Sequence, residues 1–309
     1  MKRLLLYIRQ SSLVLIMMIA TSFLVTILHQ STTFAATKEP SGLTISPLRT
    51  EPEIAPGTVY TGQLLLVNTT ASNMTISMSS AQFGVVDENY DYSFNLTSEL
   101  TGWVLFSPSS FLLTPGNEID VTYTVNVPLG AEPGGRYISL FATSQPSAVD
   151  GSGIKSQEQV ASLLYITVTG DVTRYGKLVS LHNPWLMTGP TIWTTEIQDN
   201  GTTHFESDYS LTEETLFGKQ VGYMSGSALI LPDSIRLVTG NIPQPKTPGI
   251  YKIVYSIGLG DEPAVNTTRY IIYVSPLDGI LILFVVAMGI GLGYRYYRNV
   301  NKRKKSQKH

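Results

Sequence analysis

Hydrophobic and polar side chains alternate along much of the chain between residues 44 and 274. The clearest example is residues 121–127, where three valines and Tyr123 alternate with Thr122, Thr124 and Asn126. A period of two places successive side chains on opposite faces, which is typical of a half-buried β-strand. Turn signals recur about every 8 to 12 residues, with no 3.6-residue helical period between them. The pattern therefore predicts an all-β fold of antiparallel strands.

The strands divide into two predicted β-sandwiches of immunoglobulin-like architecture, at residues 37–172 and 173–275. In the first we expect strands at 45–48, 59–67, 74–83, 103–106, 111–113, 121–127, 136–142 and 160–169. In the second we expect strands at 177–181, 191–198, 204–211, 221–231, 235–239, 249–258 and 267–274. The sequence Asp199-Asn200-Gly201 is typical of a tight hairpin and predicts that its flanking strands pair with each other.

The N-terminus carries an export signal. Lys2, Arg3 and Arg9 precede an apolar run at residues 13–28, and small residues follow it. This order predicts a signal peptide at residues 1–36, cleaved after Ala35 or Ala36. An uncleaved first membrane helix is the alternative, and either reading exports the segment that follows.

The C-terminus carries a membrane anchor signal. An apolar run with flanking tyrosines extends from Leu277 to Tyr297, and the basic tail at residues 298–309 contains no acid. This predicts one transmembrane helix at residues 277–297 with a cytoplasmic C-terminus. The second sandwich would then lie near the bilayer, and the first would extend outward together with its tip at residues 87–95.

Charge and cysteine content narrow the possible partners and the cellular location of the protein. Of the 21 basic residues, three precede residue 10 and seven follow residue 294, which leaves 11 against all 23 acidic residues in the predicted exported part. Its net charge of −12 disfavours nucleic acid as a partner. The chain has no cysteine, whereas exported eukaryotic domains of this size usually carry disulfides. We therefore expect a bacterial cell-surface protein.

Residues 87–95 form the most distinctive local pattern. Asp87, Asn89, Asp91 and Ser93 have the spacing of the first ligands of a calcium loop, but Tyr92 stands where such a loop has glycine. A polar hairpin turn explains the same residues and is the preferred interpretation.

The aromatic residues of that pattern offer a second interpretation. Tyr90, Tyr92 and Phe94 form a candidate contact patch at the tip, and burial of one or two of them on a strand face is the alternative.

Enzyme machinery is scarce in the sequence. No nucleophile elbow, zinc-protease motif or phosphate-binding glycine loop occurs. His182 and His204, the two histidines of the predicted ectodomain, are expected at surface or partly buried polar positions. We therefore predict a protein that is not an enzyme and has neither a catalytic site nor a cofactor.

Several short segments of the first sandwich occur in a distinctive order: Ile45-Ser46-Pro47, Ala55-Pro56-Gly57, Leu66-Val67-Asn68, residues 87–92, Leu113-Thr114-Pro115-Gly116, Val127-Pro128 and Pro133-Gly134-Gly135-Arg136-Tyr137. In this order the domain resembles the first domain of the WxL-interacting surface proteins of Gram-positive bacteria. The resemblance covers residues 43–170. The resemblance implies binding of WxL partner proteins and peptidoglycan through this domain.

These observations lead to a functional expectation. We expect a single-pass cell-surface protein that binds or displays partner proteins or cell-wall material through its sandwiches, with strand addition to a sheet edge as one mode. The alternative is a membrane-anchored accessory subunit of a secretion, pilus or envelope enzyme complex.

Overall fold

The computed structural model describes residues 42–145, 147–148, 155–275, 278–279, 286–291 and 293–294. Strands make up 62% of these residues and helices 6%, so the all-β prediction is confirmed. The predicted signal peptide, the basic tail and most of residues 277–297 lie outside the described ranges. Within those ranges, no helix is both long enough and apolar enough to cross a bilayer.

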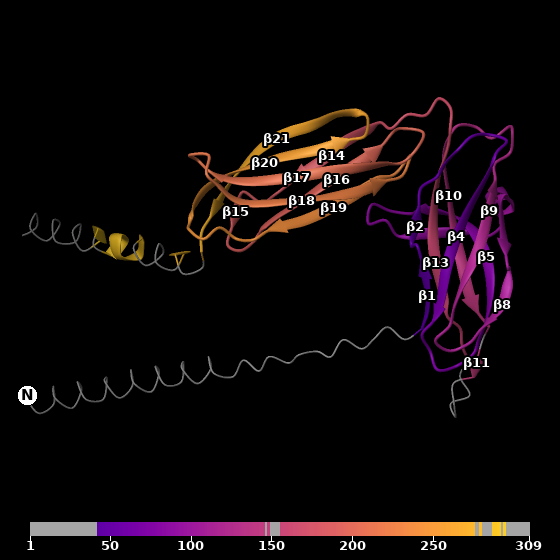
Figure 1. Cartoon of the computed structure of the whole chain (residues 1–309). Coiled ribbons are helices and arrows are strands. Elements are labelled where there is room, and N and C mark those ends of the chain that lie inside the picture. The colour runs from indigo at the N-terminus through magenta and orange to yellow at the C-terminus, as the bar shows by residue number, and fades with distance from the viewer. Residues whose placement is uncertain are drawn as a thin grey trace, which may run out of the picture. The chain divides into compact units, whose positions relative to one another are not determined.

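The first sandwich consists of two main sheets (Figure 1). The smaller has the order β1 (Leu43–Ser46), β4 (Val59–Asn68), β9 (Glu118–Asn126) and β7 (Val104–Ser107). The larger has the order β2 (Arg49–Thr50), β13 (Gln159–Val168), β10 (Gly134–Ser144), β5 (Met74–Val85) and β6 (Tyr92–Asn95). In the larger sheet, β3 (Glu53–Ile54) also pairs with β13 and β8 (Ser110–Leu113) with β5. A short 3₁₀ helix spans Glu99–Trp103, and β11 (Ser147–Ala148) pairs with β12 (Lys155–Ser156).

The predicted alternation in residues 121–127 produces the core of this sandwich. Val121, Tyr123 and Val125 are almost completely buried, and they face side chains of β5, β10 and β13 from the opposite sheet. Trp103 packs at the margin of this core.

The second sandwich also consists of two sheets (Figure 1). The smaller has the order β14 (Gly176–His182), β16 (Thr191–Asp199) and β19 (Ile235–Ile242). The larger has the order β15 (Leu186–Met187), β21 (Glu262–Tyr273), β20 (Gly249–Leu259), β17 (Phe205–Thr215) and β18 (Gln220–Ile230). Trp193 on β16 and Tyr255 on β20 are the largest fully buried side chains between these sheets.

The predicted hairpin at residues 199–201 is wrong. β16 pairs with β14 and β19, whereas β17 pairs with β18 and β20, so the chain crosses between sheets at this point. The turn packs against the segment that links the sandwiches: Asn200 N–H donates to the Tyr175 carbonyl at 2.8 Å. A Cβ atom on Gly201 would lie 2.4 Å from the Thr173 carbonyl oxygen, so glycine serves close packing here.

Candidate functional site

The turn at residues 87–91 joins β5 to β6 and is shaped by one side chain. The Asp87 Oδ1 atom accepts hydrogen bonds from the N–H groups of Asn89, at 3.0 Å, and Asp91, at 3.2 Å. Tyr90 between them has φ of 66°, in the left-handed region. Aspartate commonly stabilises turns by bonding its own backbone in this way.

The candidate calcium ligands lie in different local settings. Ser93 is a strand residue of β6 opposite Gly84, whereas Asp87, Asn89 and Asp91 belong to the turn. Across the described part of the chain, no group of three or more acidic or histidine side chains could hold a metal ion. The hydrogen bonds of Asp87 form the polar turn of the preferred interpretation, and calcium binding stays the alternative interpretation.

Tyr90 connects the turn to the second sandwich. Its side chain is buried, and its hydroxyl accepts a hydrogen bond from Leu231 N–H at 2.8 Å and lies 2.9 Å from Ser234 Oγ. The Arg236 guanidinium stacks 4.4 Å from the ring centroid. Leu237 N–H also donates to the Glu88 carbonyl at 2.7 Å. The expectation that this tip reaches outward is therefore wrong, because it packs on the start of β19 and the turn before it.

The other two aromatic residues of the predicted patch remain at the surface. Tyr92 is 42% exposed and Phe94 is 46% exposed. Phe94 makes an edge-to-face contact with Phe141, at 5.2 Å between centroids, and Tyr92 makes one with Phe83 at 5.5 Å. Tyr90 is thus buried, whereas Tyr92 and Phe94 stay partly exposed on the outer face of the larger sheet.

A buried aromatic group fills the junction between the sandwiches. We call it the junction cluster; its buried members are Phe83, Tyr90, Tyr165, Leu229 and Leu231. Tyr137 lies beside the cluster. Its hydroxyl oxygen is 3.2 Å from His204 Nδ1 and accepts a hydrogen bond from the His204 backbone N–H at 3.0 Å. Burial lowers the pKa of the His204 imidazole, which favours a neutral ring. His204 is therefore a structural residue of the junction.

Charged residues line a shallow hollow at the rim of this junction. Arg174 Nη2 lies 3.3 Å from Glu53 Oε1, and His204 Nε2 lies 3.6 Å from Glu51 Oε2. Arg49 pairs with Glu51 and stacks 5.2 Å from the Tyr165 ring. The hollow holds about 250 Å³, and Glu206 and Asp261 also line it. Exposed pairs of this kind each contribute roughly 0–1 kcal/mol.

Asp199 is the buried acid of the sheet-crossing turn. Its Oδ1 accepts a hydrogen bond from Gly201 N–H at 2.7 Å, and Oδ2 has no partner within the described residues. Burial raises the pKa of this carboxyl to about 7, and nearby Asp233 contributes in the same direction. The side chain is fully buried, so ionisation at alkaline pH places an uncompensated charge inside the protein.

The outermost strand of the second sandwich, β18, has an open edge. Among the described strands it pairs only with β17, although it is 11 residues long. Its sequence QVGYMSGSALI contains neither charge nor proline. Natural sheets usually protect long edges with charges, proline or bulges. At one end the Arg236 guanidinium donates to the Leu229 carbonyl, so the open stretch is residues 220–228.

The other described edges are short or protected. β1, β6, β7 and β8 each span four residues, and β2 and β3 span two. β14 carries Lys177 and an irregularity between Leu178 and Ser180. β21, which pairs with β15 at two residues only, carries Pro263 and Arg269. The eight-residue edge strand β19 carries Arg236, and its Leu237 N–H donates to the Glu88 carbonyl. β18 has one register irregularity of its own, at Val221. Within the described part of the chain, β18 is therefore the longest edge that lacks both charge and proline.

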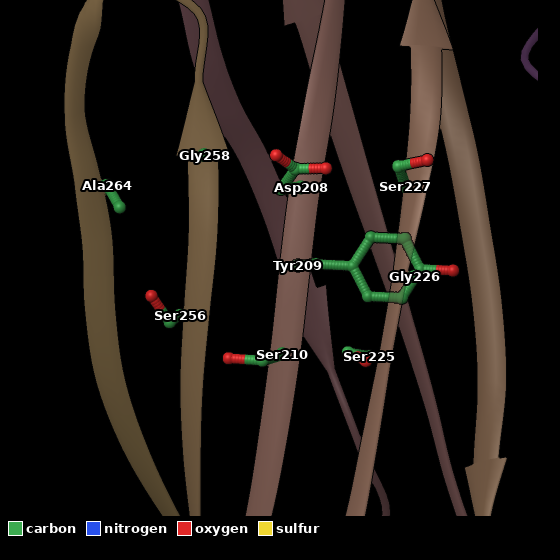
Figure 2. A pocket seen from close by; sticks show the side chains of 9 residues that line it. All are labelled: Asp208, Tyr209, Ser210, Ser225, Gly226, Ser227, Ser256, Gly258 and Ala264. Atoms are coloured by element: carbon green, nitrogen blue, oxygen red, sulfur yellow. The ribbon is translucent and has the colours of Figure 1, made fainter.

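A shallow hollow of about 550 Å³ lies beside the β18 edge (Figure 2). Small side chains from three adjacent strands form its floor, with Ser225 on β18 opposite Ser210 on β17, and Ser256 next on β20. The Tyr209 ring points toward Gly226, where any Cβ would lie 2.5 Å from its hydroxyl. The lining of the hollow is therefore mostly small and polar, with Asp208 as its single acid. Beside it on β17, Glu206 accepts a hydrogen bond from the Ser227 hydroxyl of β18.

Comparisons with known proteins give distant structural likeness only. No family model matches the sequence, and no curated protein matches it. The class 5 fimbriae chaperone CfaA is similar at 10% identity over 74% of this chain and 99% of its own, with a TM-score of 0.40. The chaperone–tip subunit complex CsuC–CsuE of Acinetobacter baumannii is similar at 15% identity over 76% of this chain and 100% of its own, with a TM-score of 0.38. The E. coli chaperone DraB is similar at 12% identity over 75% of this chain and 98% of its own, with a TM-score of 0.33. Such values assign neither a family nor a ligand.

The contact of Tyr90 with the second sandwich can be tested with Tyr90→Phe. The change leaves the buried N–H of Leu231 without its acceptor, which should lower the free energy of unfolding by about 1–3 kcal/mol. Urea unfolding measures the loss. Tyr92→Phe is the matched control, because its half-exposed hydroxyl makes only a 3.4 Å contact with Tyr165. Equal midpoints for the two variants would contradict the proposed role of Tyr90.

The raised pKa of Asp199 predicts a pH-dependent stability. The folded pKa of about 7 exceeds the ordinary value of 3.8. The contribution of protonated Asp199 to the free energy of unfolding is therefore complete below pH 4 and is lost as pH rises through 7. The loss should be on the order of 4 kcal/mol. Asp199→Asn keeps an acceptor for Gly201 and removes the ionisable group, so its unfolding free energy should vary less between pH 4 and 8. Parallel pH profiles for the two proteins would exclude Asp199 as the source.

Proposed function

We propose that this chain is a non-enzymatic, single-pass cell-surface protein that binds a partner protein by strand addition to β18. The observation that carries the proposal is the 11-residue edge, which lacks charge and proline and pairs on one side only. Strand addition uses the backbone groups of such an edge for affinity, and side-chain pockets beside it for specificity.

The surroundings of β18 suit an added strand. Val221, Tyr223, Ser225 and Ser227 alternate with less exposed residues, so they present one row of side chains along the edge. Tyr223 is 56% exposed and supplies an aromatic contact. The hollow of Figure 2 adjoins the Ser225 and Ser227 positions and leaves room for side chains of the incoming strand.

The anchor and the partner complete the proposal. Residues 277–297 are the proposed transmembrane helix, and residues 1–36 the proposed signal peptide. The sequence resemblance makes a WxL-domain protein and peptidoglycan the first ligands to test. A protein segment suits an open strand edge better than a glycan does, because its own backbone can pair with the edge.

Charges on the β18 edge should abolish partner binding. In Val221→Lys/Tyr223→Lys both substituted side chains are largely exposed, so folding should be retained while strand addition is blocked. We expect a partner captured by the tagged full-length protein from surface extracts to be lost with this variant.

The matched control is Thr268→Lys on β21, an exposed position away from β18. It should capture the partner at the wild-type level. Capture by the β18 variant at the wild-type level, or equal loss with both variants, would overturn binding at this edge.

A further inference from the structure

One end of the second sandwich gathers the loops next to the point where the chain leaves it. We call it the exit end: the loops at residues 183–190, 216–219 and 243–248, together with the end of β21. The strand registers place them there: Thr215 is opposite Tyr251, Gly249 opposite Tyr273, and Thr191 opposite Ile242. Val274, the residue that follows β21, donates its N–H to the Met187 carbonyl at 3.0 Å.

Large apolar side chains are exposed at the exit end. Phe217 is fully exposed at the tip of the β17–β18 turn, and Leu216 is 57% exposed next to it. Trp185 is 68% exposed, and its carbonyl accepts a hydrogen bond from Ile272 N–H at 2.7 Å. Ile250 lies opposite Ile272, one pair from the end of the β20–β21 ladder, and both are partly exposed. Several large exposed apolar side chains at one end of a domain favour an interaction surface there.

The turn that carries Phe217 is well defined. Thr215 N–H donates to the Lys219 carbonyl and Gly218 N–H donates to the Thr215 carbonyl, both at 2.9 Å. Gly218 has φ of 78°, which glycine adopts without steric cost. The backbone therefore holds Phe217 in an exposed position although no described side chain covers it.

The charge of the exit end differs from that of the rest of the ectodomain. Its three loops contain no acidic residue and two lysines, Lys219 and Lys246. The predicted exported part as a whole has a net charge of −12 by the count above. Apolar and aromatic side chains with flanking lysines match the composition of segments that lie in the headgroup region of anionic bilayers.

We propose that the exit end rests on the membrane, with Phe217, Leu216 and Trp185 inserted into the headgroup region of the bilayer. The occupant follows from the chain path, because only two residues separate Val274 from the apolar run that begins at Leu277. This inference rests on the proposed transmembrane anchor. It adds a second attachment that fixes the orientation of the second sandwich and holds the β18 edge at a set height above the lipid.

The absence of cysteine allows a direct test. Phe217→Cys in the full-length protein gives a single thiol for an environment-sensitive fluorophore, and Ser227→Cys on the same hairpin is the matched control. The proteins are reconstituted in vesicles of phosphatidylcholine and phosphatidylglycerol that carry a quencher at the headgroup level. We expect severalfold stronger quenching at position 217 than at 227. Equal quenching at the two positions overturns the inference.

A third label separates this inference from the anchor itself. Met288→Cys places the fluorophore within the proposed transmembrane segment, where a quencher deep in the acyl chains should reach it. Quenching at 288 without quenching at 217 leaves the anchor intact and overturns membrane contact by the exit end. Absence of quenching at 288 overturns the anchor, and the inference with it. A blue-shifted but unquenched label at 217 indicates a protein contact, such as a second copy, and also overturns the inference.

Discussion

Backbone pairing is the constraint on which this structure depends. Each open sheet ends in two strands that have hydrogen-bonding groups on one side without a sheet partner. In the first sandwich the edges are strands of two or four residues, and the chain even divides its first strand segment between both sheets as β1, β2 and β3. In the second sandwich the same constraint leaves β18 open over residues 220–228. The functional proposal follows from this difference between two otherwise similar sandwiches.

Contacts at the junction between the sandwiches hold one end of the β18 edge. Tyr90 reaches from the β5–β6 turn to the N–H of Leu231, the residue directly after β18, and Arg236 links the Tyr90 ring to the Leu229 carbonyl. One end of β18 is thereby held by the first sandwich. Its other end begins beside the turn that carries Phe217. The open stretch, residues 220–228, lies between this held end and that turn.

Sequence periodicity predicted the all-β fold because side-chain alternation is local. Val121, Tyr123 and Val125 are buried as the alternation required. The turn chemistry at Asp199-Asn200-Gly201 also marked a reversal, but a local signal does not say which strands pair across it. Asp199 is instead buried against the next loop, where Asp233 N–H donates to its carbonyl. Pairing partners depend on tertiary contacts that no window of sequence contains.

In the candidate site, too, some features follow from the local sequence and others depend on tertiary contacts. The turn at residues 87–91 was predicted from Asp87 and its neighbours, and the structure shows the Asp87 hydrogen bonds that form it. The burial of Tyr90 was left open, since it depends on the second sandwich some 140 residues later in the chain. The β18 edge was predicted as a strand, yet its edge position required the strand order. The sequence shows that β18 lacks charge, but only the strand order shows that this uncharged strand is an edge.

Amide hydrogen exchange on the full-length protein tests the open edge most directly. In the absence of a partner, alternate amides of residues 220–228 should exchange much faster than those of β17 and β20, because their N–H groups point away from the sheet. Uniform protection of β18 at the level of β20 in the isolated protein would contradict the account, since the edge would then already be covered.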